Sequence, residues 1–132
     1  MPSVREFTVS LMQGLSNNDI LGQVNRAVSF VRQNVTYIRD PVDSEYVISP
    51  VRMLDSFTAT GYMAGDCDDH VMLLNTMLGS VGIQTKFVGV KFGNASEYNH
   101  VISGIFVGGQ MYLVDPCAKG STQPTYSDII TV

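Results

Sequence analysis

The stretch Gly65-Asp66-Cys67-Asp68-Asp69-His70 (GDCDDH) opens the clearest helical pattern in the chain. Apolar residues follow it at helical spacing: Val71, Leu74, Met77, Leu78 and Val81. Asp68 and Asp69 stand where the first turn of a helix favours negative charge. We therefore predict a helix that begins at or near Cys67 and that Gly79 and Gly82 bring to an end.

Cys67 is the candidate nucleophile of this stretch. Unpaired backbone N–H groups and the positive end of the helix dipole favour a thiolate at a helix start. The carboxylates of Asp66, Asp68 and Asp69 oppose it, because like charges within about 4 to 6 Å disfavour ionisation. A nearby imidazolium would reverse that balance, so the question is which histidine the fold brings to Cys67.

Two further helices are expected before this one. Apolar residues at helical spacing predict a helix from about 18 to 34, with Asn17 or Asn18 as its N-cap. The pair Ser49-Pro50 places a capping residue before a proline at the first helical position. It predicts a short helix that reaches about Phe57.

Extended segments come mostly after the Cys67 helix. Alternating and β-branched residues predict strands over residues 85–92, 100–107 and 110–114, besides a short extended piece at 35–38 and a loop at 39–48. Gly108-Gly109 joins the last two strands, since Gly-Gly supplies the positive φ angles of a tight hairpin turn. Helices followed by strands indicate an α+β fold, with N-terminal helices packed on a small three-stranded antiparallel sheet.

The hairpin fixes which residues share a face of the sheet. With Gly108-Gly109 as a two-residue turn, Ile102 opposes Asp115, and His100 and Asp115 become diagonal neighbours on one face. An imidazole and a carboxylate at that spacing can form a hydrogen bond. We also expect the Cys67 helix to pack over this face, because Gly104 leaves room there for a close approach.

Composition and charge limit the classes of function. The 132 residues are 45% apolar and 15% charged, which indicates one compact domain over 1–132, with 1–15 as a loosely ordered arm. The formal net charge is −4 and no basic run is present, so nucleic acid is not expected as a partner. No apolar run approaches the roughly 18 residues of a membrane span, and the first ten residues lack an export signal. We therefore expect no membrane partner and a cytoplasmic location.

The order of three motifs resembles the transglutaminase-like superfamily of papain-type cysteine enzymes. These motifs are Cys67 in GDCDD at a helix start, His100 on a strand, and Asp115 in LVDP on the next strand. The YIRDP and SPVRML stretches resemble the helical lead-in of short microbial members, so the likeness covers about Val24 to Pro116. Small members of this superfamily occur in bacterial and phage genomes. The resemblance therefore implies a phage particle as a further location of the protein.

The resemblance implies a papain/transglutaminase-like core with the nucleophile at a helix N-terminus. It implies Cys67 as the nucleophile, His100 as general base and acid, and Asp115 as the group that orients His100. The expected reaction is acyl transfer on amide or peptide bonds of a protein or peptide, as a peptidase, deamidase or transglutaminase performs it. We expect no cofactor and no metal ion.

The oxyanion donor is open at the level of sequence. The backbone N–H of Cys67 is one donor, and the side chains of Asn34, Tyr37 and Tyr62 are further candidates. Many relatives carry a tryptophan two positions after the histidine, where this chain has Ile102.

Two other readings stay open. One is a catalytically silent module that keeps the fold and binds a protein partner, in a bacterial or phage assembly. The other is a metal site formed by Asp66, Cys67, His70 and His100. For His70 itself we expect a place on the helix surface. Cys117 would oppose His100 unless Pro116 ends the strand pairing first.

Overall fold

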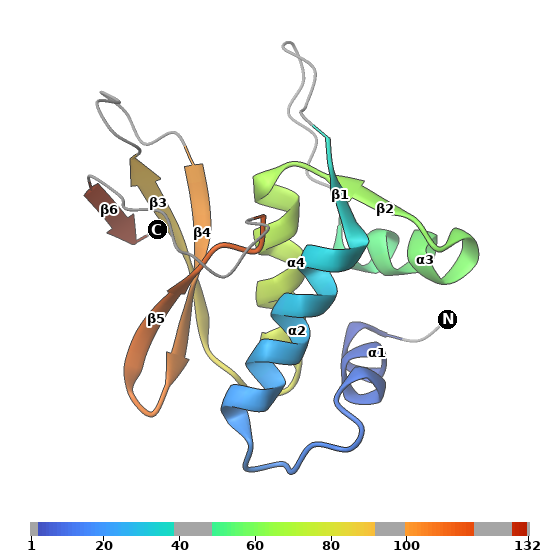
Figure 1. Cartoon of the computed structure of the whole chain (residues 1–132), viewed down its shortest axis with the longest axis horizontal. Helices are drawn as coiled ribbons and strands as arrows, with labels where there is room; N and C mark the ends of the chain where they lie inside the picture. Colours follow the sequence, from blue (N-terminus) through green and yellow to red (C-terminus); the bar gives the residue numbers. More distant parts are fainter. Residues whose placement is uncertain (1–2, 39–48, 92–99, 118–127, 132) are drawn as a thin grey trace.

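The computed structural model describes residues 3–38, 49–91, 100–117 and 128–131. Figure 1 shows the helices gathered on one side of the larger sheet. The helices are α1 (Val4–Leu11), α2 (Ile20–Asn34), α3 (Pro50–Thr60) and α4 (Cys67–Ser80). The strands are β1 (Val35–Tyr37), β2 (Met63–Gly65), β3 (Thr85–Lys91), β4 (His100–Val107), β5 (Gln110–Val114) and β6 (Asp128–Thr131). The expected α+β class is confirmed, and the loop expected at 39–48 lies outside the described residues.

The starts of α2 and α3 follow from their caps. The carboxylate of Asp19 accepts the N–H of Gly22 at 3.0 Å, so the N-cap of α2 is Asp19 and not Asn17 or Asn18. Ser49 caps α3 as predicted, with proline at its first position. That helix runs three residues beyond Phe57 and ends at a glycine in the left-handed region.

The first fifteen residues are not a loosely ordered arm over the part that is described. Val4, Phe7 and Leu11 lie on one side of α1 and pack against the core. The ring centroid of Phe7 lies 5.2 Å from that of Phe30 and 6.3 Å from that of Phe57. The apolar residues of α1 have helical spacing, which explains why the helix forms. The segment is too short for that pattern to stand out in the sequence, so the helix was not predicted.

The strands form two sheets. β1 pairs in parallel with β2, which the sequence did not predict. The larger sheet has the order β5-β4-β3-β6, so β6 adds a fourth strand to the three expected. The predicted hairpin register is confirmed, since Phe106 opposes Met111 and Ser103 opposes Val114.

The sheet face that α4 covers is the opposite of the one predicted. Ile105 of β4 and Val114 of β5 share the core with Leu74 and Met77 of α4. Ile105 and Val114 lie on the opposite face of the sheet from Gly104, because side chains alternate along a strand. The expectation that α4 packs over Gly104 is therefore wrong.

The room beside Gly104 is filled from within the sheet. A Cβ at this position would lie 2.8 Å from the Met111 sulfur and 3.0 Å from a Val88 methyl group. Val88 packs there with Ile102 in a second, smaller apolar group. A small residue in a strand thus accommodated a neighbouring side chain, not a helix.

α4 is the central helix of the fold. It contacts the other three helices as well as β2, β3 and β4. Leu73, Leu74, Met77 and Leu78 have no exposed surface. Where α4 begins therefore decides where Cys67 lies relative to every other element.

A capping box fixes the first residue of α4. The carboxylate of Asp66 accepts the N–H of Asp69, and the carboxylate of Asp69 accepts the N–H of Asp66, at 3.2 and 3.1 Å. Asp69 is buried, and a Cβ on Gly65 would lie 2.5 Å from its Cβ. The glycine before Asp66 is therefore needed for Asp69 to reach its partner.

We expect Gly65→Ala to lower the free energy of unfolding by about 1 to 3 kcal/mol, because the added methyl group displaces Asp69 from the capping box. Urea denaturation measures this loss. Gly79→Ala is the matched control, since a Cβ there meets nothing within 4 Å and alanine is the better helix former. Equal stability of the two variants would contradict this role of Gly65.

Candidate active site

Three of the residues singled out in the sequence come from three different elements. Cys67 is the first residue of α4, His100 is the first residue of β4, and Asp115 follows the last residue of β5. Figure 1 shows that α4 begins, β4 begins and β5 ends at the same end of the molecule. The site lies at this end, beyond the part of the sheet that α4 covers.

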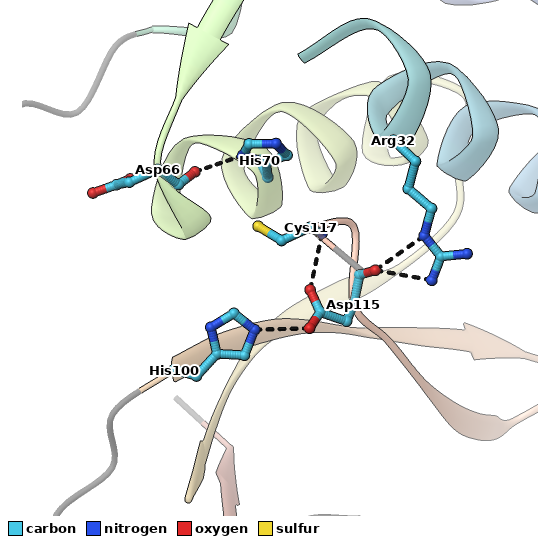
Figure 2. Close-up of polar contacts among 6 residues, drawn as sticks. All are labelled: Arg32, Asp66, His70, His100, Asp115 and Cys117. Atoms are coloured by element: carbon cyan, nitrogen blue, oxygen red, sulfur yellow. Dashed lines mark hydrogen bonds and ion pairs between the residues drawn. The ribbon is translucent and has the colours of Figure 1, made fainter. Parts of the chain in front are cut away.

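His100 interacts with the side chains of both Asp115 and Cys67. Its Nε2 lies 2.8 Å from Oδ2 of Asp115, as Figure 2 shows. The side chain of Cys67 also acts on the ring and raises the pKa of His100. His100 is thus paired with Asp115 and lies within electrostatic reach of Cys67.

The surroundings of His100 favour its charged form. Burial of the ring by itself would lower the pKa, but the hydrogen bond to Asp115, the interaction with the side chain of Cys67 and the negative charge of Asp115 outweigh it. The pKa of His100 rises from 6.5 to about 9. An imidazolium is therefore the dominant form near neutral pH.

Asp115 is held from three sides. Its Oδ2 meets His100, its Oδ1 accepts the N–H of Cys117 at 2.9 Å, and its backbone carbonyl accepts two N–H groups of Arg32 at 3.1 and 2.9 Å (Figure 2). Burial alone would raise the pKa of Asp115, but these hydrogen bonds and the charges of His100 and Arg32 lower it. The carboxylate is therefore ionised and fixed in direction.

Sequence reasoning missed Arg32. It lies on α2, 83 residues before Asp115, and nothing in its local sequence marks it out. Its two N–H donors bind the backbone carbonyl of Asp115, just beyond the end of β5. Strand pairing ends at Val114, so none of the described strands supplies a hydrogen bond to this carbonyl.

Cys117 lies near the site but is not placed opposite His100. Strand pairing of β5 ends at Val114, before Pro116, as predicted from the lack of a backbone N–H in proline. Burial first, and then the charges of Asp115, Cys67, Asp66 and Asp68, raise the pKa of the Cys117 thiol. Cys117 is therefore a neutral thiol whose backbone, not its sulfur, serves the site.

A family model for the transglutaminase-like superfamily matches residues 5–116. The chain belongs to this superfamily.

Two solved structures share the superfamily fold. A candidate protease from Parabacteroides distasonis superposes with a TM-score of 0.68 at 18% identity, over 92% of this chain and 23% of that one. A candidate cysteine protease from Cytophaga hutchinsonii gives 0.64 at 18% identity, over 89% of this chain and 40% of that one. The chain thus spans less than half the length of either. No curated protein matches it.

His70 is not on the surface of this transglutaminase-like domain, contrary to the sequence-based expectation. Only 2% of its surface is exposed, because α4 is covered on most sides. Its Nδ1 donates to the backbone carbonyl of Asp66 at 2.6 Å, and its ring lies 6.1 Å from that of Tyr37.

The candidate oxyanion donors differ in placement. The N–H of Cys67 belongs to the first turn of α4, where helical N–H groups have no partner within the helix. The amide of Asn34 donates to the carbonyl of Phe30 in its own helix. Tyr37 is half exposed, and its ring lies beside the first turn of α4. Among the side chains, Tyr37 is therefore better placed than Asn34.

Three other findings are separate from this chemistry. The described residues contain no group of three or more His, Cys, Asp and Glu side chains placed to hold a metal ion, so the metal reading gains no support. A hollow of about 590 Å³ lies between α1, α2 and the end of α4, and none of the site residues lines it. No helix in the described segments has the length and apolar character to cross a bilayer.

We expect the ring of His100 to lose its proton near pH 9 in an NMR titration, well above the ordinary value of 6.5. Because the folded-state pKa is raised, the stabilisation from this ion pair is complete below pH 6.5 and is lost as the pH rises through about 9. Asp115→Asn should lower the pKa, since it removes the strongest interaction that raises it. A wild-type titration near 6.5 would contradict the described geometry.

We expect Arg32→Met to raise the pKa of Asp115 toward its ordinary value and to cost about 1 to 3 kcal/mol of stability. Carbon-13 NMR of the carboxyl group and urea denaturation measure the two effects. Arg26→Met is the matched control, because Arg26 also donates to two backbone carbonyls, those of Leu11 and Gln13. It should lower stability without moving the Asp115 titration, and an equal shift in both variants would rule out a specific role for Arg32.

Proposed function

We propose that the protein is a cysteine-dependent acyl-transfer enzyme that acts on amide or peptide bonds. Cys67 is the nucleophile, His100 the general base and acid, and Asp115 the group that orients His100. The observation that carries the proposal is that one imidazole ring is hydrogen-bonded to a carboxylate through Nε2, at 2.8 Å, and that the side chain of Cys67 lies close enough to raise the pKa of the same ring.

The first half of the reaction forms a thioester. The thiolate of Cys67 attacks the carbonyl carbon, and the N–H of Cys67 donates to the oxygen as it becomes negative. The imidazolium of His100 then gives its proton to the departing amine, and the C–N bond breaks. A His100 pKa of about 9 supports this step, because the ring carries the proton it must donate at neutral pH.

The second half releases the acyl group. Neutral His100 takes a proton from water or from an amine, which attacks the thioester; the C–S bond then breaks, and the thiolate of Cys67 and the imidazolium of His100 are restored. Water gives a peptidase or deamidase, and an amine gives a transglutaminase. The triad geometry is the same for both, because the choice depends on the access of water and of the second substrate. We propose a protein or peptide as the substrate and a cytoplasmic site of action.

A p-nitrophenyl ester tests the proposal without knowledge of the substrate. We expect a burst of p-nitrophenolate and an acetyl group on Cys67, found by mass spectrometry of the digested protein. Cys67→Ala should abolish the burst, and His100→Ala should slow it by about 10²- to 10⁴-fold.

Cys117→Ser is the matched control, since it keeps the backbone N–H that binds Asp115. It should acylate at nearly the wild-type rate. Equal acetylation of both cysteines, or a burst that is insensitive to His100→Ala, would contradict the proposal. An inert Cys67 in the folded protein would favour the silent binding module instead.

A further inference from the structure

We propose that His70 is a positioning residue that holds the Asp66–Cys67 peptide group, so that the N–H of Cys67 is fixed in the direction of the substrate oxyanion. The inference rests on the proposed acyl transfer and adds a residue to its machinery. It concerns a histidine that neither the triad nor the capping box uses.

The contact itself is short and buried. Nδ1 of His70 lies 2.6 Å from the backbone oxygen of Asp66, as Figure 2 shows. Only 2% of the surface of His70 is exposed. A carbonyl oxygen can only accept, so Nδ1 carries the proton. The backbone N–H of His70 donates to the same oxygen at 3.1 Å. The carbonyl of Asp66 therefore has two donors from one residue.

The geometry of the peptide carries this constraint to Cys67. The carbonyl of Asp66 and the N–H of Cys67 belong to one planar trans unit and point in opposite directions. Fixing the carbonyl toward His70 therefore fixes the N–H away from it, out of the start of α4. There the N–H is free of any bond within the helix and can donate to a substrate.

The backbone at this point needs the extra contact. Asp66 is the N-cap and has extended angles, φ −88° and ψ −167°, so helical geometry does not set both sides of its peptide. The capping box holds its N–H and its carboxylate but not its carbonyl. His70 completes the set, and donation to the carbonyl also strengthens the N–H of the same peptide as a donor.

Three variants of His70 separate this role from a packing role. His70→Leu fills most of the space without a donor, and His70→Asn places an amide N–H close to where Nδ1 stands. We expect His70→Leu to lower the rate of acylation by a p-nitrophenyl ester by about 10- to 100-fold, toward the loss typical of a missing oxyanion donor. His70→Asn should recover most of that rate. His70→Gln, whose amide reaches the place of Nε2 instead, should not.

Alkylation by iodoacetamide supplies the decisive contrast. It uses the same thiol but develops no oxyanion, so the alkylation rate of Cys67 should stay within about twofold of the wild-type rate in all three variants. A parallel fall of acylation and alkylation, or an unchanged acylation rate in His70→Leu, would overturn the proposal. Where His70→Leu fails to fold, the comparison of His70→Asn with His70→Gln decides in the same way.

The amide NMR signal of Cys67 tests the positioning apart from catalysis. We expect its proton and nitrogen shifts to change in His70→Leu and His70→Gln and to return toward wild type in His70→Asn. If the wild type acylates no ester, the proposed function fails while this measurement still decides the inference. Unchanged Cys67 shifts in every variant would overturn it.

Discussion

The start of α4 is the constraint on which the rest of the site depends. The reciprocal bonds between Asp66 and Asp69 begin the helix at Cys67, and Gly65 leaves the room that they need. Because α4 is the central helix, this one boundary sets the position of the thiol relative to both sheets. A helix that began one residue later would leave Cys67 as the N-cap, outside the helical geometry that now sets the direction of its side chain.

The same bonds give two of the carboxylates beside Cys67 a structural role. The side chains of Asp66 and Asp69 accept backbone N–H groups of the first turn. The carboxylate of Asp115 faces His100 and favours the imidazolium, on which the side chain of Cys67 also acts. Asp66 and Asp69 thus stabilise the helix start, and Asp115 orients the histidine.

Local structure could be predicted from the sequence and long-range packing could not. The hairpin register followed from Gly108-Gly109, because a two-residue turn fixes the pairing, and the helix start followed from the acidic residues around Cys67. The face that α4 covers, the burial of His70 and the contact from Arg32 depend on how distant elements pack. No local pattern carries that information, and the short strands β2 and β6 lack enough residues to show one.

The most direct test of the central claim compares the two thiols of the folded protein. Iodoacetamide at about pH 6, followed by mass spectrometry of the digest, gives the alkylation rate of each cysteine. The account predicts that Cys67 is alkylated rapidly, since His100 is its charged partner. It predicts that Cys117 is spared, because burial and nearby carboxylates raise the pKa of its thiol. Equally slow alkylation of both cysteines would contradict the assignment of Cys67 as the nucleophile.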